Sequence, residues 1–157
     1  MKEDSKLYSG ALDRHSSAGY MTNWAARLFA RVMDKRLKPL GMSCGQMPVF
    51  FALSARPTLS QKQLAEAAAT EQPTMAATLA RMERDGLLVK RPNPQDGRSA
   101  LYSLSPKAQE KSMEIRAAVE EINAAALSGL EAQERAAYLA MMAKVVGTLE
   151  ACLAPQD

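Results

Sequence analysis

Residue types that carry enzyme chemistry are scarce in this sequence of 157 residues. His15 is its only histidine, and Cys44 and Cys152 are its only cysteines. It contains no glycine-rich phosphate loop, no nucleophile motif and no cysteine–histidine cluster at metal-ligand spacing. Because nucleophilic catalysis needs a base beside the nucleophile, we expect no enzymatic activity, no cofactor and no metal site.

Aromatic residues make up only 5% of the chain, and common alanine and methionine favour helix over sheet. No apolar run approaches the roughly 18 residues of a membrane span, and residues 1–6 lack the apolar core of a signal peptide. These features predict a cytoplasmic protein with no membrane partner. In a reducing cytosol both cysteines are expected to be buried thiols, with redox sensing through either one as the alternative.

The formal net charge of +3 is small, but its distribution is uneven. Residues 1–40 are rich in lysine and arginine, whereas residues 105–157 carry more acidic than basic side chains. A polyanion such as DNA is therefore expected to meet the N-terminal or middle part of the chain.

Apolar spacing and capping signals predict helices joined by short loops, with one β-hairpin. Ser43 with Gln46, and Ser60 with Gln63, have the spacing of capping boxes, and Thr70 is expected to cap the next helix. Turn-forming residues 92–97 separate two strand-like runs. The predicted helices are 12–38, 43–53, 60–68, 71–85, 106–127 and 131–153, and the predicted strands are 87–91 and 100–104.

Two short helices followed by a hairpin form a winged helix-turn-helix. The predicted fold is mainly α, with a DNA-binding domain at 41–104 between long N- and C-terminal dimerisation helices at 1–40 and 105–157. The apolar stripes of helices 106–127 and 131–153 need a partner surface that a single winged helix cannot provide. A homodimer is therefore expected.

The helix over 71–85 has two different faces. Met75, Leu79 and Met82 are predicted to pack inward. The opposite face is expected to present Thr74, Thr78 and Arg81, with Gln72 at the helix start. Small polar groups let a helix approach base edges, and arginine or glutamine pairs with guanine or adenine. An ordinary solvated helix face is the alternative interpretation.

The hairpin and the preceding helix offer further contacts to DNA. Arg98, beside the Asp96-Gly97 pair and near Arg91, is placed to reach a minor groove. Asp96 is expected to fix Arg98 or Arg91 by an ion pair. Ser60 and Gln61 open a helix whose start suits a phosphate contact.

These motifs together resemble the MarR family of bacterial transcriptional regulators. The resemblance spans roughly residues 12–153 and is carried by Gln72-Pro73-Thr74-Met75, Arg81-Met82-Glu83, Gly86-Leu87-Leu88, Asp96-Gly97-Arg98 and Leu104-Ser105. It implies an obligate homodimer that represses transcription by binding an inverted repeat in double-stranded DNA, and a small aromatic or anionic effector that releases the protein from the DNA. The expected DNA-binding residues are Ser60, Gln61, Gln72, Pro73, Thr74, Thr78, Arg81, Arg91 and Arg98, with Asp96 stabilising the wing.

One departure from the family concerns Ala77, where many members carry an arginine; Arg81 and Arg98 are then expected to carry more of the binding. The resemblance also implies an effector pocket at His15, Trp24, Met47 and Phe51, with Arg14 or Arg27 as partner for a carboxylate. A winged-helix module that binds a protein rather than DNA is the remaining alternative.

Overall fold

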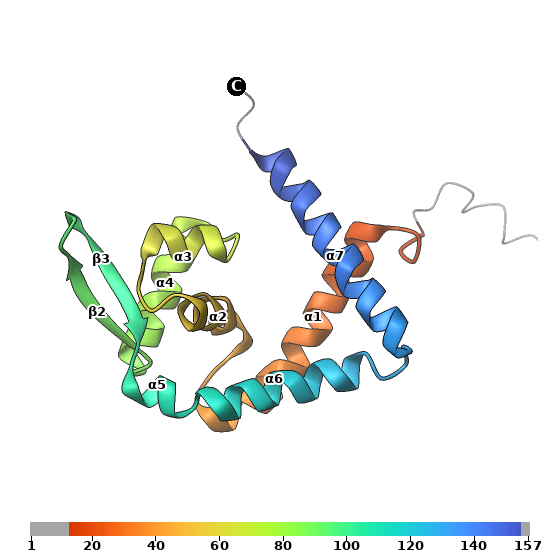
Figure 1. Ribbon diagram of the computed structural model, residues 1–157, viewed down its shortest axis with the longest axis horizontal. Coiled ribbons are helices and arrows are strands. Elements are labelled where there is room, and N and C mark those ends of the chain that lie inside the picture. The colour runs from red at the N-terminus through yellow and green to blue at the C-terminus, as the bar shows by residue number, and fades with distance from the viewer. Residues whose placement is uncertain (1–12, 155–157) are drawn as a thin grey trace, which may run out of the picture. The chain divides into compact units, whose positions relative to one another are not determined.

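The computed structural model describes residues 13–154, which form a mainly helical chain with a small three-stranded sheet. The predicted fold class is confirmed. The chain divides into two compact units between Val119 and Glu120. In the first unit, a β-hairpin over residues 88–104 projects beside the helices that lie between residues 47 and 84 (Figure 1).

The N-terminal helix α1 spans Ala18–Leu37 and begins later than predicted. Ser17 caps it, because the Ser17 side chain accepts a hydrogen bond from the backbone N–H of Tyr20 at 3.3 Å. Residues 14–16 form a turn instead, in which the Asp13 carboxylate accepts from the His15 backbone N–H at 3.0 Å. Residue 12, the predicted start, lies outside the described residues. The short 3₁₀ helix η1, Lys38–Leu40, follows α1 and ends at Gly41.

Both predicted capping boxes are confirmed. The backbone N–H groups of Ser43 and Ser60 donate to the side-chain oxygens of Gln46 and Gln63, each at 2.9 Å. The first box opens a 3₁₀ turn, η2 (Cys44–Gln46), which leads into α2 (Met47–Ala55). The second opens α3 (Gln61–Ala67). The starts of two helical segments, η2 and α3, are therefore specified by the local sequence.

Helix α4 spans Gln72–Arg84, and its N-cap is Glu71. The prediction that Thr70 caps it was wrong, because the Thr70 hydroxyl donates to the Ala68 carbonyl at 3.0 Å and turns back toward α3. The predicted inward face is confirmed: Met75, Leu79 and Met82 are all buried.

The sheet contains β1 (Leu59–Ser60), β2 (Leu88–Asn93) and β3 (Asp96–Leu104), in the order β1-β3-β2. All neighbouring strands are antiparallel. Asp96 pairs with Asn93, so the turn consists of Pro94 and Gln95 rather than all of 92–97. The Asn93 side chain accepts from the Gln95 backbone N–H at 3.0 Å, which favours this turn. Strand β1 was not predicted.

The predicted helix over 106–127 is interrupted at Lys111. It consists of α5 (Pro106–Glu110) and α6 (Ser112–Ala126), and the predicted cap Ser105 accepts from the Ala108 backbone N–H at 3.1 Å. Lys111 Nζ donates to the Leu40 carbonyl at 2.7 Å. One helical turn earlier, Lys107 Nζ donates to the Asp85 carbonyl at 2.9 Å. These lysines tie α5 to the ends of η1 and α4.

Replacing Lys111 with methionine is expected to lower the free energy of unfolding by roughly 1–2 kcal/mol, because the Leu40 carbonyl loses a charged donor. Urea unfolding of the full chain at one fixed protein concentration measures this loss. The matched control is Lys35→Met, which removes an exposed lysine from α1 and should change stability by under about 0.5 kcal/mol. Equal effects of the two substitutions would contradict the role of Lys111.

The last helix, α7, spans Ala132–Leu153 and begins with a capping interaction in which the Glu131 backbone N–H donates to Glu134 at 2.8 Å. An 18-residue window of α7 has a mean hydropathy of 1.4, with none of it buried. By length and composition it is apolar enough to cross a membrane, although Lys144 and Glu150 interrupt it and its longest uninterrupted apolar run is residues 136–143. The exposed large apolar side chains of α7 are Leu139, Met141, Val145, Val146, Leu149 and Leu153.

Candidate nucleic-acid interface

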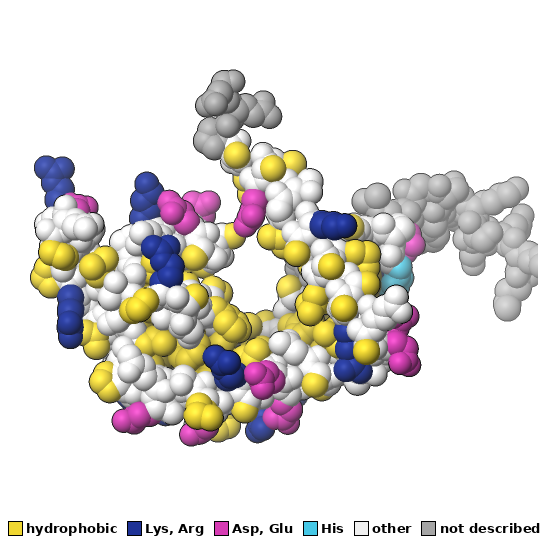
Figure 2. Space-filling view, in the orientation of Figure 1, with side chains coloured by type: hydrophobic (Ala, Val, Ile, Leu, Met, Phe, Trp, Pro, Cys, Tyr) yellow, Lys and Arg dark blue, Asp and Glu magenta, His cyan; other side chains and the backbone are white. Residues whose placement is uncertain are grey.

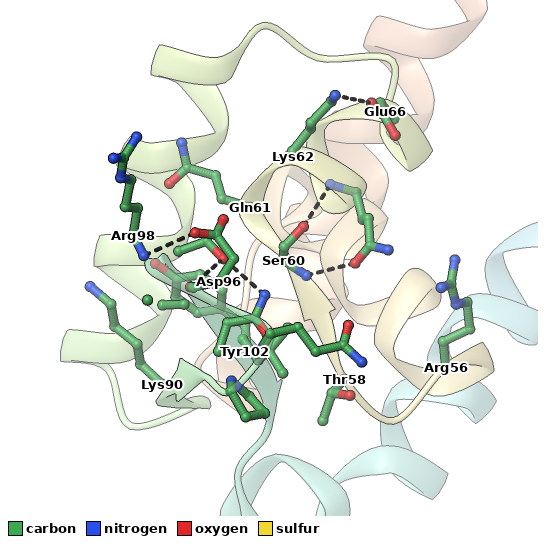
Figure 3. Close-up of a pocket in the computed structure, with 18 of the residues that line it drawn as sticks. Arg56, Thr58, Ser60, Gln61, Lys62, Glu66, Lys90, Asp96, Arg98 and Tyr102 are labelled. Atoms are coloured by element: carbon green, nitrogen blue, oxygen red, sulfur yellow. Dashed lines mark hydrogen bonds and ion pairs between the residues drawn. The ribbon is translucent and has the colours of Figure 1, made fainter.

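A groove of about 1070 Å³ lies between the β2–β3 hairpin and the starts of α3 and α4. Five of the predicted site residues line it: Ser60, Gln61, Gln72, Asp96 and Arg98. Figure 3 shows Arg98 and Asp96 on the hairpin, with Ser60 at the end of β1, directly before α3, and Lys62 on α3. The fold thus brings together residues from three separate stretches of sequence.

The groove is predominantly cationic. Arg56, Lys62, Lys90 and Arg98 line it, against Glu66 and Asp96. Lys62 and Glu66 form an ion pair at 4.0 Å, but both side chains are strongly exposed, so the pair holds the lysine only weakly. Figure 2 shows Lys and Arg side chains over the hairpin and the helices beside it. Such a surface attracts a polyanion.

The wing is ordered by hydrogen bonds to its backbone. The Asp96 carboxylate accepts from the Arg98 backbone N–H at 3.0 Å, and the Asn93 amide donates to the Ser99 hydroxyl at 2.9 Å. Across residues 13–154, no ion pair joins Asp96 to Arg98 or Arg91, so that expectation was wrong. Asp96 instead fixes the backbone that carries Arg98 and leaves the guanidinium available.

The outer face of α4 differs from the prediction at one position. Thr74, Ala77 and Arg81 are exposed, but Thr78 is only 6% exposed and accepts from Arg81 Nη2 at 3.3 Å. With about 100° per residue, Thr78 lies only about 40° from Met82, at the rim of the apolar face. The expectation that Thr78 projects toward a partner was therefore wrong. Pro73, Thr74, Arg81 and Arg91 are exposed but do not line the groove.

Sequence reasoning missed Arg56 as a site residue. It follows α2 directly, in Arg56-Pro57-Thr58, which the sequence marks only as a helix end. The pairing of Leu59 with Tyr102 brings this loop beside the hairpin. A cation just before a capping box is a signal that could have identified it.

Of the predicted effector residues, two lie in contact with each other. His15 and Trp24 lie together, with ring centroids 6.1 Å apart, and the Arg14 guanidinium lies 5.0 Å from the Trp24 ring centroid. Met47 is buried in the core, whereas Phe51 is 56% exposed. Arg27 donates to Asn23 at 2.9 Å. Of the two arginines considered, Arg14 is therefore the one in contact with the aromatic pair.

The expectation of two buried thiols was wrong, because Cys44 is half-buried and Cys152 is exposed. Burial and, second, the nearby Asp34 carboxylate raise the pKa of the Cys44 thiol. Asp34 also accepts from the Cys44 backbone N–H at 2.6 Å, which holds the two residues together. A raised pKa leaves less thiolate at neutral pH, which disfavours thiol-based sensing through Cys44.

In a Cys152→Ser variant, where Cys44 is the only thiol, alkylation by iodoacetamide at pH 7 is expected to be several-fold slower than in the denatured chain. Adding Asp34→Asn should speed the reaction, because it removes a negative charge that raises the pKa. The rate should rise with pH in both proteins. An alkylation rate in the folded chain that equals or exceeds the denatured rate would contradict the assignment.

Comparison with known proteins gives a matching family model and similar solved structures. The family model described as "MarR family" matches residues 40–99. The chain is 26% identical to a probable transcriptional regulator from Pseudomonas aeruginosa, covering 85% of this chain and 99% of the other, with a TM-score of 0.77. It is 25% identical to the PcaV transcriptional regulator from Streptomyces coelicolor in complex with its natural ligand, covering 87% and 96%, with a TM-score of 0.78.

The fold also matches that of a mutant MarR from E. coli complexed with operator DNA. That match has 20% identity, covers 81% of this chain and 91% of the other, and has a TM-score of 0.75. At this identity the similarity concerns the fold alone.

Proposed function

We infer that this chain belongs to the MarR family of transcriptional regulators, and we propose that it is a repressor that binds an inverted-repeat operator as a cytoplasmic homodimer. We further propose that a small aromatic or anionic effector releases it from the DNA. The single observation that carries DNA binding is the cationic groove between the wing and the starts of α3 and α4.

In the proposed complex, α4 enters the major groove and the wing reaches the adjacent minor groove. The exposed Pro73, Thr74 and Arg81 face the base edges, together with Gln72 at the start of α4. Ser60 and Gln61 contact phosphate, as do Arg91 beside the groove and the cations Arg56, Lys62 and Lys90 that line it. Arg98 enters the minor groove, where a guanidinium is attracted by the concentrated negative potential. The basic surface favours DNA over a protein partner.

We propose that the dimer forms through the terminal helices, as the division into 41–104 and the flanking segments 1–40 and 105–157 implies. Residues 1–12 and 155–157 of those segments lie outside the described residues. The exposed apolar side chains of α7 are the main support, since a soluble monomer rarely leaves such a surface open to water. A second copy of the chain is the partner that the family suggests.

The effector is proposed to bind where Arg14, His15 and Trp24 meet, with the exposed Phe51 contributing from α2, whereas Met47 is buried in the core and is not expected to contact the effector. An arginine stacked on an aromatic ring suits a planar ligand with a carboxylate. Titration with benzoate-type acids, monitored by Trp24 fluorescence and by release of bound DNA, tests this. The binding should be lost in Arg14→Ala and kept in Arg27→Ala.

Selection from a duplex pool with a randomised centre tests operator recognition. The protein should enrich an inverted repeat with half-sites about 10 base pairs apart, centre to centre. Affinity for the enriched duplex should fall steeply with salt, as expected when several cations contact phosphate. Enrichment of no sequence, or of one unrepeated half-site, would contradict the proposal.

A further inference from the structure

A hydrogen bond joins the first residues of the two helices that border the groove. Gln61 Nε2, at the start of α3, donates to Gln72 Oε1, at the start of α4, over 3.1 Å. Both glutamines line the groove; Gln61 is half-buried and Gln72 is exposed. The bond links the helix proposed to contact phosphate with the helix proposed to read bases.

The bond determines which edge of the Gln72 amide is turned outward. A free glutamine presents one donor and one acceptor and can therefore pair with adenine, which also presents one of each in the major groove. When Oε1 of Gln72 is directed at Gln61, the Nε2 group lies on the other side of the carbamoyl carbon. The outward group is then a donor.

We propose that Gln61 is a positioning residue that orients Gln72 as a hydrogen-bond donor, so that Gln72 selects guanine in each half-site. Guanine presents two acceptors, N7 and O6, in the major groove, whereas adenine presents only one acceptor beside a donor. Fixing the amide before binding also lowers the ordering cost on complex formation. This inference rests on the proposed operator binding.

The test compares base preferences of full-length variants by selection from the same duplex pool with a randomised centre. Gln72→Ala removes the side chain proposed to contact the base, and Gln61→Ala removes the side chain proposed to orient it. The double variant combines the two substitutions. Gln61→Glu offers only acceptors, so Gln72 must turn Nε2 toward it and Oε1 outward. Lys62→Glu is the matched control, because it places a negative charge on the neighbouring exposed residue without changing the glutamine pair.

The wild type should prefer guanine at one position of each half-site by roughly 5- to 100-fold. Gln61→Ala and Gln72→Ala should lose that preference at the same position, and the double variant should lose no more. Gln61→Glu should shift the preference toward adenine or cytosine, which present donors. Lys62→Glu should weaken binding to all sequences alike and should retain the preference for guanine.

Two results would overturn the inference while leaving operator recognition intact. One is a Gln61→Ala profile that keeps the wild-type base preference, which would make Gln61 only a phosphate contact. The other is a Gln61→Glu profile identical to that of Lys62→Glu. No enriched sequence with the wild type would instead overturn the proposed function. Because a preference is a ratio within one sample, loss of folded protein cannot mimic these outcomes.

Discussion

Replacing Val145 and Leu149 together with glutamate is expected to give a monomeric protein that binds the operator at least about 100-fold more weakly. The two side chains lie one helical turn apart on α7 and are 44% and 58% exposed in the single chain. A dimer that covers them would have to bury two carboxylates per chain without partners, which is strongly unfavourable. Without the dimer, each half-site is bound by a separate protein molecule. The gain in affinity from binding both half-sites at once is then lost.

Analytical ultracentrifugation of the wild type and the variant, without detergent, measures the expected change in mass. Fluorescence anisotropy with the selected duplex measures the change in affinity. The control is the pair Gln133→Glu and Lys144→Glu, which adds more negative charge to α7 on its polar side and should remain dimeric. A wild type that sediments as a folded monomer, or a Val145/Leu149 variant that stays dimeric, would contradict the proposed interface.

The parts of the fold that the sequence predicts are those specified by neighbouring residues. The capping boxes at Ser43 and Ser60 each need only four consecutive residues, and both form as expected. The spacing of Met75, Leu79 and Met82 is sufficient to identify the buried face of α4. Such patterns are local, so their outcome does not depend on the rest of the chain.

The elements that were not predicted from the sequence are those set by a contact between residues far apart in the chain. The break at Lys111 coincides with a hydrogen bond to Leu40, 71 residues away, which no local pattern reveals. Strand β1 has only two residues and exists because it pairs with β3. Thr78 is a different case: it was placed outward because it is polar, although the helix period sets it about 40° from Met82, at the rim of the apolar face, where it is buried.

The sequence identified the residues of the candidate site better than it identified the contacts between them. Ser60, Gln61, Gln72, Asp96 and Arg98 do line one groove, as a winged helix implies. The bond between Gln61 and Gln72 was not predicted, because nothing in the sequence sets the approach of α3 to α4. The hydrogen bond from the Arg98 backbone N–H to the Asp96 carboxylate was also not predicted, because an aspartate near an arginine more readily indicates an ion pair.

Arg98→Ala is expected to weaken operator binding by roughly 1–3 kcal/mol for each arginine removed, and thus by up to twice that in a dimer. Its guanidinium forms no ion pair within residues 13–154, so it is available to a minor groove. The preference for A·T pairs at the operator flanks should flatten, because narrow A·T tracts attract arginine most strongly. Arg98→Lys should recover non-specific affinity without recovering the flank preference. An equal loss on operator and random duplexes would make Arg98 a phosphate contact.

Substitutions at Asp96 separate the two ways in which it can support Arg98. The structure has the Asp96 side chain accepting from the Arg98 backbone N–H at 3.0 Å, a bond that an asparagine oxygen also forms. Asp96→Asn should therefore keep the flank preference, whereas Asp96→Ala should lose part of it by freeing the backbone that carries Arg98. Removing a negative charge should also raise affinity for all DNA slightly in both variants. If Asp96→Asn instead loses the preference as fully as Asp96→Ala, the carboxylate charge is what matters, and an ion pair to Arg98 or Arg91 must form on the DNA.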